Sequence, residues 1–246
     1  MKCLILAAGY ATRLYPLTEN FPKPLLKVGD RTILDHLVDD IEKSGEIDEY
    51  VVISNHKYAA HFTGWADKRA QRVTVVDDGT ETNETRLGAV KDILFAIEKL
   101  GLDDDLLVIA GDNLLDFSLC KFIKYAKEKK SSCIMRYYEP EYNRLIKCGV
   151  VEIDGDDRIL SMTEKSTEPK THWCCPPFYF YTRYDAKQIK RGIEEGCPTD
   201  APGSFAAYLS AKSPVYAMEM PGARYDIGNI DSYRAVCENY KGIKGE

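Results

Sequence analysis

Short apolar runs alternate with amphipathic stretches in the first half of the chain. Mainly apolar runs at 3–7, 50–53, 73–76 and 106–110 have the length and composition of buried parallel strands. Apolar residues recur at helical spacing over 33–41 and again over 87–97, which predicts two helices that each bury one face. This alternation over the first 130 residues predicts a parallel, Rossmann-type sheet.

The second half has a different pattern. Strands are predicted at 133–138, 149–153, 159–163 and 173–181 with few helices between them, so this part is expected to be antiparallel or mixed. Helices are predicted to return at 184–195 and 202–209. The pattern contains no repeat and no linker, so we expect an α/β fold forming one domain over 1–246, with lobes at 1–130 and 131–246.

The first strand ends in a loop with the composition of a phosphate-binding site. Ala7, Ala8 and Gly9 are small enough to let the backbone approach a ligand closely. Arg13 and Lys23 follow in a proline-rich loop, and fixed amides with two cations suit a triphosphate. The alternative is an ordinary strand-to-helix connection with solvated charges. Long loops without secondary structure are uncommon unless they are functional, which favours the site.

An acidic residue, Asp112, follows the apolar run at 106–110. Open α/β sheets bind ligands at the carboxyl ends of their strands, and a carboxylate there suits Mg²⁺. Alternatively, Asp112 caps the helix that begins near Ser118, although Asp116 and Ser118 lie closer to that start. We therefore favour Asp112 as a metal ligand.

Composition narrows the class of protein. The chain has 246 residues, of which 44 % are hydrophobic and 29 % charged, as in a soluble globular enzyme. A net charge of −6 argues against a nucleic-acid surface but allows a local phosphate site. The eight cysteines form no C-x-x-C motif, so neither zinc nor a disulfide framework is expected. No apolar run suggests a signal peptide or membrane span, so a cytoplasmic location is expected.

The segment from Leu6 to Thr18, with Pro22 and Lys23, resembles the signature of sugar-1-phosphate nucleotidylyltransferases (NDP-sugar pyrophosphorylases), L-A-G/A-G-x-G-T-R-L-x-P-L-T…P-K. Within that family, the chain resembles short glucose-1-phosphate thymidylyltransferase-like enzymes. The matching positions are Gly9, Thr12, Arg13, Leu14, Pro16, Leu17, Thr18, Pro22 and Lys23. The chain departs from the signature at Ala11, where the family usually has Gly. Because Ala disfavours positive φ, we expect Ala11 in a right-handed backbone conformation.

Two segments of the second half resemble further family motifs. Residues 147–152 resemble the Y-G-V-V strand, in which Gly149 would admit a sugar ring. Residues 161–166 resemble E-K-P, which implies that Glu164 binds sugar hydroxyls and Lys165 binds the sugar phosphate. The resemblance also implies that Arg86, Leu87 and Gly88 lie near the nucleotide base. On residue type alone, Gly88 could equally serve helix packing against the first strand.

Residues 225–229 resemble W/Y-x-D-x-G, whose acid is the second metal ligand of the family; here it is Asp226. An N-cap role for Asp226 is disfavoured, because Asn229 and Asp231 compete for it. Asp112 and Asp226 are far apart in sequence, so we expect them to share Mg²⁺ only if the two lobes close over it. The implied fold is the mixed-sheet nucleotide-diphospho-sugar transferase (GT-A-like) type, with a nucleotide-binding lobe at 1–130 and a sugar-phosphate-binding lobe at 131–246.

The implied reaction is direct transfer of a nucleotidyl group from a nucleoside triphosphate to a sugar-1-phosphate, with Arg13, Lys23 and Asp112 as catalytic residues. The alternative is a CTP:phosphocholine cytidylyltransferase of the same fold, which the sixteen tyrosines do not exclude as cage residues. A nicotinamide dehydrogenase is disfavoured, because Gly9–Leu14 lacks G-x-G-x-x-G. A ligand sensor would be expected to lose Lys23, Asp112 or Asp226. The expected partners are these two substrates, and neither a nucleic acid nor a membrane is expected. The chain could also form a homo-oligomer. The sequence leaves open which base and which sugar are used.

Overall fold

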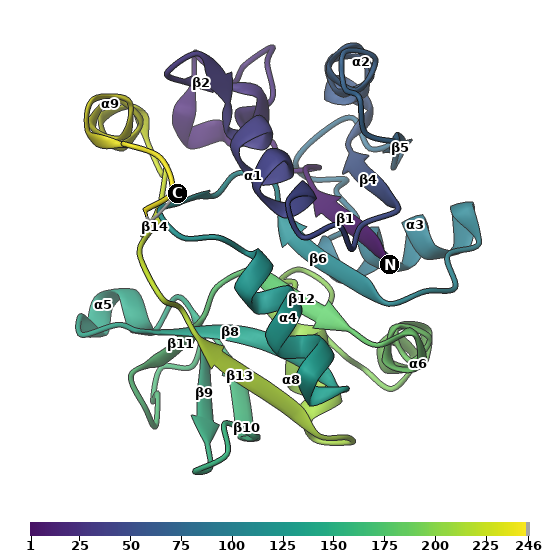
Figure 1. Cartoon of the computed structure of the whole chain (residues 1–246), viewed down its shortest axis with the longest axis vertical. Helices are drawn as coiled ribbons and strands as arrows, with labels where there is room; N and C mark the ends of the chain where they lie inside the picture. The colour runs from purple at the N-terminus through teal and green to yellow at the C-terminus, as the bar shows by residue number, and fades with distance from the viewer. Residues whose placement is uncertain (245–246) are drawn as a thin grey trace. The chain divides into compact units, whose positions relative to one another are not determined.

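The computed structural model describes residues 1–244, and the chain divides into two compact units (Figure 1). Unit 1 consists of Met1–Arg86, Ala110–Lys121 and the C-terminal segment that starts at Pro221. Unit 2 consists of Leu87–Ile109 and Phe122–Met220. The units are therefore interleaved along the chain. The functional lobes expected at 1–130 and 131–246 stay a prediction.

Unit 1 contains the parallel strands β1 (Lys2–Leu6), β4 (Glu49–Ser54) and β5 (Val73–Asp77). β4 pairs in parallel with both β1 and β5, as the apolar runs predicted. Helices α1 (Ile33–Glu42) and α2 (His56–Ala66) connect them. A capping box of Thr32 and Asp35 starts α1, and the Asn55 side chain caps α2, which satisfies backbone N–H groups that a helix start leaves free.

The C-terminal segment folds into unit 1. Strand β14 (Arg224–Tyr225) pairs antiparallel with β7 (Leu114–Leu115), and α9 (Ile230–Asn239) follows. The loop after β1 contains two 3₁₀ turns, η1 (Thr12–Leu14) and η2 (Lys23–Leu25). A hairpin of two short strands follows, β2 (Lys27–Val28) and β3 (Arg31–Thr32). One buried cluster joins all these parts: Leu14, Leu26, Val28, Ile33, Leu114, Ile227 and Val236. The C-terminal helix therefore packs against the loop that follows β1.

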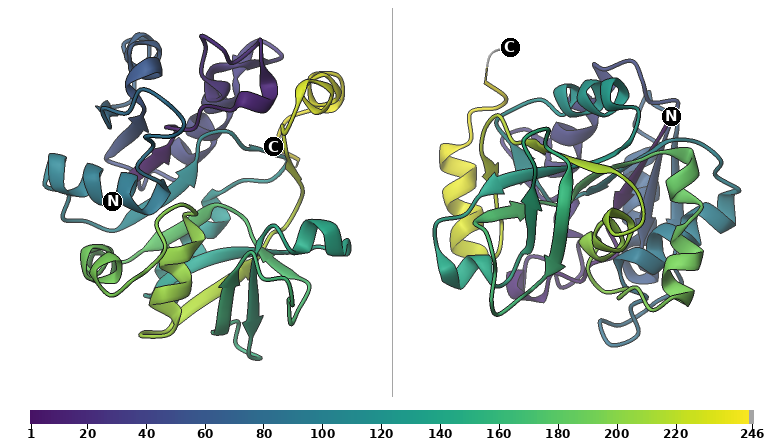
Figure 2. Two further views of the ribbon diagram at one scale, coloured as in Figure 1. Left: turned by 180° about the vertical axis from the view of Figure 1, so that it is seen from behind. Right: turned by 90° about the horizontal axis from the view of Figure 1, so that it is seen from below.

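Unit 2 is built on a mixed sheet around β8 (Ser132–Tyr138). β8 pairs antiparallel with β11 (Trp173–Cys175) and β12 (Phe178–Tyr181), and parallel with β13 (Val215–Glu219). β12 also pairs with β6 (Leu106–Ala110), while β9 (Gly149–Ile153) pairs with β10 (Ile159–Glu164) and β11. Figure 2 shows these mixed directions from two sides. The antiparallel or mixed second half is thus confirmed.

The helices of unit 2 mostly follow the sequence pattern. They are α3 (Ala89–Leu100), α5 (Tyr142–Leu145), α6 (Arg183–Ala186), α7 (Ile189–Glu194) and α8 (Gly203–Ser210), while α4 (Cys120–Lys129) begins in unit 1. Two long predicted elements are each divided, the strand at 173–181 at Pro176 and Pro177, and the helix at 184–195 near Lys187. The prolines lack the N–H groups that a continuous strand needs.

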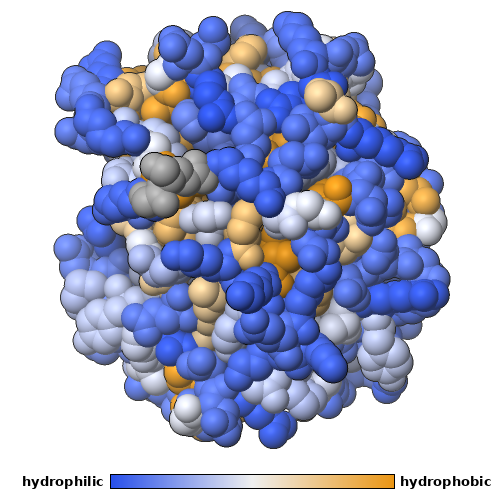
Figure 3. Space-filling model, viewed as in Figure 1, coloured by the Kyte–Doolittle hydropathy of each residue, from blue (hydrophilic) through white to orange (hydrophobic). Residues whose placement is uncertain are grey.

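The surface face in Figure 3 is mostly hydrophilic, with apolar side chains in small groups. Among the described residues, no helix is long and apolar enough to span a membrane.

Candidate active site

Hydrogen bonds to their backbone groups hold the small residues after β1 in place. The Ala7 amide donates to the Ile53 carbonyl at 2.9 Å, and Asn55 Nδ2 donates to the Ala8 carbonyl at 2.9 Å. At Gly9 no atom lies within 4 Å of the position that a Cβ would take, so the backbone is open on that side. The segment lies at the carboxyl end of a parallel strand, where such sheets bind ligands.

Ala11 does not have the expected backbone conformation. Its φ of 46° and ψ of 42° place it in the left-handed region, so the expectation of a right-handed conformation was wrong. Two hydrogen bonds hold it there, because the Ala11 carbonyl accepts from the Leu14 amide at 3.0 Å and from Thr18 Oγ1 at 2.8 Å. The left-handed region costs a non-glycine residue about 1–2 kcal/mol. The loop therefore keeps a conformation typical of Gly, with a methyl group added.

The two cations of the loop have opposite environments. Arg13 is exposed and makes no hydrogen bond or ion pair within residues 1–244. Lys23 begins η2 and is 7 % exposed, and its Nζ lies 2.7 Å from Asp112 Oδ2. A buried lysine needs a countercharge, which Asp112 supplies here. The structure therefore brings two of the predicted site residues into direct contact.

Asp112 belongs to a chain of polar contacts. Asn113 Nδ2 lies 3.1 Å from Asp112 Oδ1, and Arg224 Nη1 donates to Asn113 Oδ1 at 3.0 Å. Burial raises the pKa of Asp112, but the charge and hydrogen bond of Lys23 and the charge of Arg224 outweigh burial, so this pKa lies below its usual value. Sequence reasoning missed Asn113 and Arg224. The signal available was their position, since each lies within two residues of a predicted metal ligand.

Asp226 lies next to this network in the fold. In the β14–β7 pair, Tyr225 is opposite Leu114, so the chain at Asp226 runs beside the segment of Asp112 and Asn113. Asp226 is exposed and makes no hydrogen bond or ion pair within residues 1–244. Asn229 caps α9, so Asp226 is not its cap. Both acids belong to unit 1, so their segments meet without closure of the two predicted lobes.

Neither acid serves as a helix cap. Ahead of α4, it is Ser118 Oγ that accepts from the Cys120 amide at 3.1 Å, and Asp116 instead accepts from the Ala223 amide at 2.6 Å. The capping alternative for Asp112 is therefore not what the structure shows.

Three buried oxygens lie near the loop in unit 1. Tyr10 Oη, Asp78 Oδ2 and Thr80 Oγ1 make no hydrogen bond among the described residues, although their side chains are at most 8 % exposed. The Asp78 amide donates to the Ser54 carbonyl, which fixes this segment at the end of β4. Burial raises the pKa of Asp78, although the Thr80 amide, which donates to Asp78 Oδ1 at 2.7 Å, opposes the shift. Buried polar atoms usually have partners, so these are candidates for ligand contacts.

Of the residues expected near the base, Arg86 is exposed, and its Nη1 contacts the backbone and side-chain oxygens of Asn83 at 3.2 and 3.1 Å. Gly88 lies in unit 2 with a φ of 91°. A Cβ there would lie 2.6 Å from the Thr199 carbonyl oxygen. Packing therefore requires Gly88, and its partner is the backbone at 199–200, which the sequence did not indicate.

The residues expected to bind the sugar phosphate come together within unit 2. A Cβ on Gly149 would lie 2.6 Å from Glu164 Oε1, and one on Gly203 would lie 1.8 Å from the same oxygen. The Glu164 carboxylate thus occupies space that two glycines leave open. Burial raises the pKa of Glu164, and the charge of Lys165 opposes this shift. Gly203 was not among the site residues predicted from the sequence; it begins α8, within the helix that the pattern predicted at 202–209.

Lys165 is exposed, with its Nζ 3.7 Å from Asp200 Oδ2. Its backbone has a φ of 51°, and its amide donates to the Cys148 carbonyl at 3.0 Å. This hydrogen bond attaches the turn after β10 to the residue before β9. The backbone at the end of β10 is therefore fixed, and the Lys165 ammonium group is open to solvent.

The fold and these groups define an α/β protein with a phosphate-type loop after its first strand, of the class that binds nucleotides. The nucleotidyl transferase family model matches residues 2–242, and the chain belongs to this family. This finding confirms the family resemblance seen in the sequence.

Solved structures have the same fold. A putative glucose-1-phosphate thymidylyltransferase from Bacillus anthracis, in complex with sucrose, matches with a TM-score of 0.80 and 21 % identity, covering 100 % of this chain and 97 % of that chain. A UDP-glucose pyrophosphorylase complexed with UDP-glucose matches with a TM-score of 0.83 and 17 % identity, covering 97 % of each chain. The predicted fold class is confirmed.

Relatives with curated names are similar in sequence. The UTP–glucose-1-phosphate uridylyltransferase AglF of Haloferax volcanii is 26 % identical over 93 % of this chain and 91 % of its own length. The bifunctional protein GlmU of Methanocaldococcus jannaschii is 30 % identical over 70 % of this chain and 38 % of its own. GlmU of Methanococcus aeolicus is 27 % identical over 100 % and 57 %. The chain thus spans between about a third and a little over half of the length of these GlmU relatives.

Proposed function

We propose that this protein catalyses Mg²⁺-dependent transfer of a nucleotidyl group from a nucleoside triphosphate to a sugar-1-phosphate, releasing pyrophosphate. Family membership and the name of the AglF relative support this substrate class. The observation that carries the proposal is the ion pair of buried Lys23 with Asp112, with exposed Arg13 and Asp226 in the same unit.

The cations of the loop would act on the phosphates. Arg13 makes no hydrogen bond or ion pair with the described residues, and it would bind the triphosphate together with the backbone amides of 7–9. The nucleophile is a phosphate oxygen of the sugar-1-phosphate, which is already an anion, so no general base is needed. The obstacle is repulsion between two polyanions. Arg13 and Lys23 would offset it and stabilise the charge that develops on the leaving pyrophosphate.

The donor set fits a magnesium ion. Mg²⁺ is usually held by one or two carboxylates together with phosphates and water. Asp112 and Asp226 supply two, and among residues 1–244 no group of three or more His, Cys, Asp and Glu side chains is placed to hold a metal. Bound there, Mg²⁺ would neutralise phosphate charge. Lys23 holds Asp112 Oδ2, so movement of Lys23 toward a triphosphate would free that oxygen as a ligand.

The other predicted residues would bind the remaining parts of the substrates. Lys165, exposed at the end of β10, would pair with the phosphate of the acceptor, and Glu164 would accept hydrogen bonds from sugar hydroxyls beside Gly149. The unpartnered oxygens of Tyr10, Asp78 and Thr80 would meet the base. Roles for Arg86 and Gly88 near the base, a cytoplasmic location and a homo-oligomer remain predictions.

A pyrophosphate-release screen tests the proposal. The purified protein is given each nucleoside triphosphate with a panel of sugar-1-phosphates, and with phosphocholine as the alternative acceptor, in Mg²⁺ or in EDTA. We expect release only with a sugar-1-phosphate and Mg²⁺ together. Release with phosphocholine alone would establish the alternative acceptor. Turnover that is unchanged in Lys23→Ala and Asp226→Asn would contradict the assigned roles.

A further inference from the structure

A cavity of about 500 Å³ lies in unit 1. It is lined by the segment 21–32, by α1 and α2, and by the residues that follow α2. None of the residues assigned above to catalysis or substrate binding lines it. Small-molecule sites in proteins usually have volumes of about 300–1,000 Å³. The cavity is thus large enough for a metabolite.

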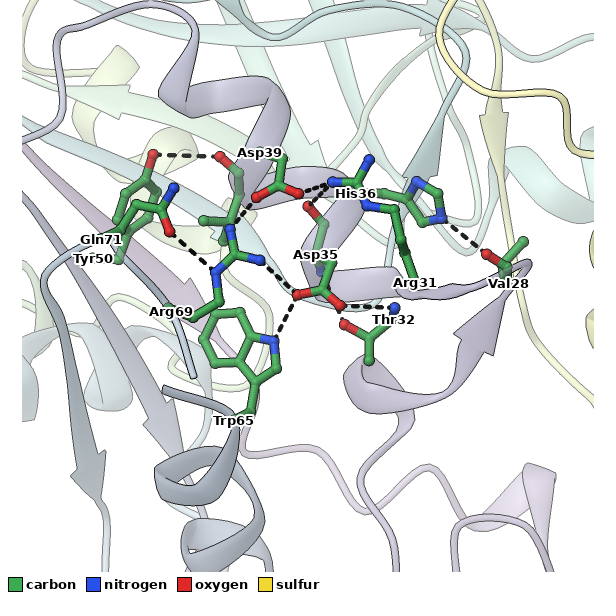
Figure 4. Close-up of polar contacts among 11 residues, drawn as sticks. Val28, Arg31, Thr32, Asp35, His36, Asp39, Tyr50, Trp65, Arg69 and Gln71 are labelled. Atoms are coloured by element: carbon green, nitrogen blue, oxygen red, sulfur yellow. Dashed lines mark hydrogen bonds and ion pairs between the residues drawn. The ribbon is translucent and has the colours of Figure 1, made fainter. Parts of the chain in front are cut away.

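One wall of the cavity is a fixed polar network (Figure 4). Asp35 Oδ1 accepts from Trp65 Nε1 at 2.9 Å and from Arg69 Nη1 at 2.8 Å, and Asp35 Oδ2 accepts from the Thr32 amide at 2.9 Å. Arg69 also pairs with Asp39. Burial raises the pKa of Asp35, but these bonds outweigh burial and the pKa lies below its usual value. The wall is therefore preorganised for a ligand.

The charges of the cavity do not balance. Asp35 is the only carboxylate that lines it among the described residues, and Arg69 already neutralises it. Lys27 and Lys68 also line it, and their side chains make no hydrogen bond or ion pair within residues 1–244. Two cations are left without a countercharge. The cavity therefore favours an anion.

Aromatic and apolar side chains line the rest. Phe21 is 37 % exposed, and its ring meets the His61 ring edge-on with centroids 5.1 Å apart. The buried Trp65 indole and Leu25 complete this part of the lining. Aromatic side chains pack favourably against other planar rings. The composition therefore suits a ligand with a flat, unsaturated body.

We propose that this cavity binds a small organic anion that carries a planar ring, with its charged group at Lys27 and Lys68 and its ring against Phe21 and His61. Leu25 lines the cavity and belongs to η2, the turn that also carries Lys23. An occupant therefore stabilises the turn that positions Lys23. Binding can be measured without turnover, so this proposal is tested separately from the proposed function.

Phenyl phosphate is a suitable probe, because it combines the ring with a phosphate. Trp65 and Trp173 are the two tryptophans, so Trp173→Phe leaves Trp65 as the only tryptophan reporter. We expect phenyl phosphate to change the Trp65 emission saturably, and inorganic phosphate or phenol alone to bind at least about tenfold more weakly. An unchanged or unsaturable signal overturns the proposal, as does equal binding of inorganic phosphate.

Three variants in the Trp173→Phe background locate the binding. Reversing both charges in Lys27→Glu/Lys68→Glu should weaken phenyl phosphate by at least about tenfold, while Lys121→Glu, an exposed lysine outside the cavity, should not. Gly64 lines the cavity within α2, and a Cβ there meets no atom within 4 Å. Gly64→Leu should therefore fold and block the cavity. If all three variants bind like the parent protein, the proposal is wrong.

Discussion

Replacing Asp112 by Asn would leave Lys23 buried without its countercharge. Lys23 is 7 % exposed and its Nζ lies 2.7 Å from Asp112 Oδ2, whereas the Asp112 side chain is 41 % exposed. Breaking a fully buried ion pair costs about 3–5 kcal/mol. Water reaches the Asp112 side of this pair, so we expect Asp112→Asn to lower the free energy of unfolding by about 1–3 kcal/mol.

The matched variant is Lys23→Met, which keeps the apolar stem and removes the buried charge. The Asp112 carboxylate can still reach solvent in this variant, so we expect the free energy of unfolding to fall by less than about 1 kcal/mol. Both variants should lose pyrophosphate release. The double variant should recover much of the stability that Asp112→Asn loses, because its Lys23 charge is gone. Only stability therefore separates the two single variants.

Urea unfolding at several pH values is the assay. The folded-state pKa of Asp112 is lowered, so its contribution is present above the unfolded value of about 3.9 and is lost as pH falls through the folded pKa. We expect the wild type and Asp112→Asn to differ most near neutral pH and to converge in acid. The reasoning is refuted if Asp112→Asn is as stable as the wild type at neutral pH, or if Lys23→Met is the less stable of the two.

Three further outcomes are expected. Asp226 is exposed and has no hydrogen-bond or ion-pair partner in the described part of the chain, so Asp226→Asn should abolish turnover and leave the urea midpoint unchanged. Asp77 Oδ2 lies 2.6 Å from His56 Nδ1, and its hydrogen bond and charge raise the pKa of His56. NMR titration should therefore place the His56 pKa above 6.5, and Asp77→Asn should lower it. Any stabilisation from this pair is lost as pH rises through the folded-state pKa. A Cβ on Gly203 would overlap Glu164, so Gly203→Ala should raise KM for the sugar phosphate more than KM for the nucleotide.

The sequence indicated both halves of the fold, because strand and helix periods are local properties. Buried strands such as β4 read as continuous apolar runs, and the glycine loop carried a long motif with mixed chemistry. Tertiary structure decided what local patterns do not encode. The sequence grouped the C-terminal segment with the second half, whereas packing of Ile227 and Val236 against Leu14 places it in unit 1.

By itself, the sequence determined the family and the strand-and-loop order, and it predicted Arg13, Lys23, Asp112 and Asp226 as site residues, since short contiguous segments carry these signals. Only the tertiary structure showed that Lys23 is buried against Asp112, that Arg224 reaches this pair through Asn113, and that Ala11 takes a left-handed conformation. The physical reason is that burial, charge pairing and backbone strain depend on contacts between residues far apart in the chain, which residue type alone does not specify.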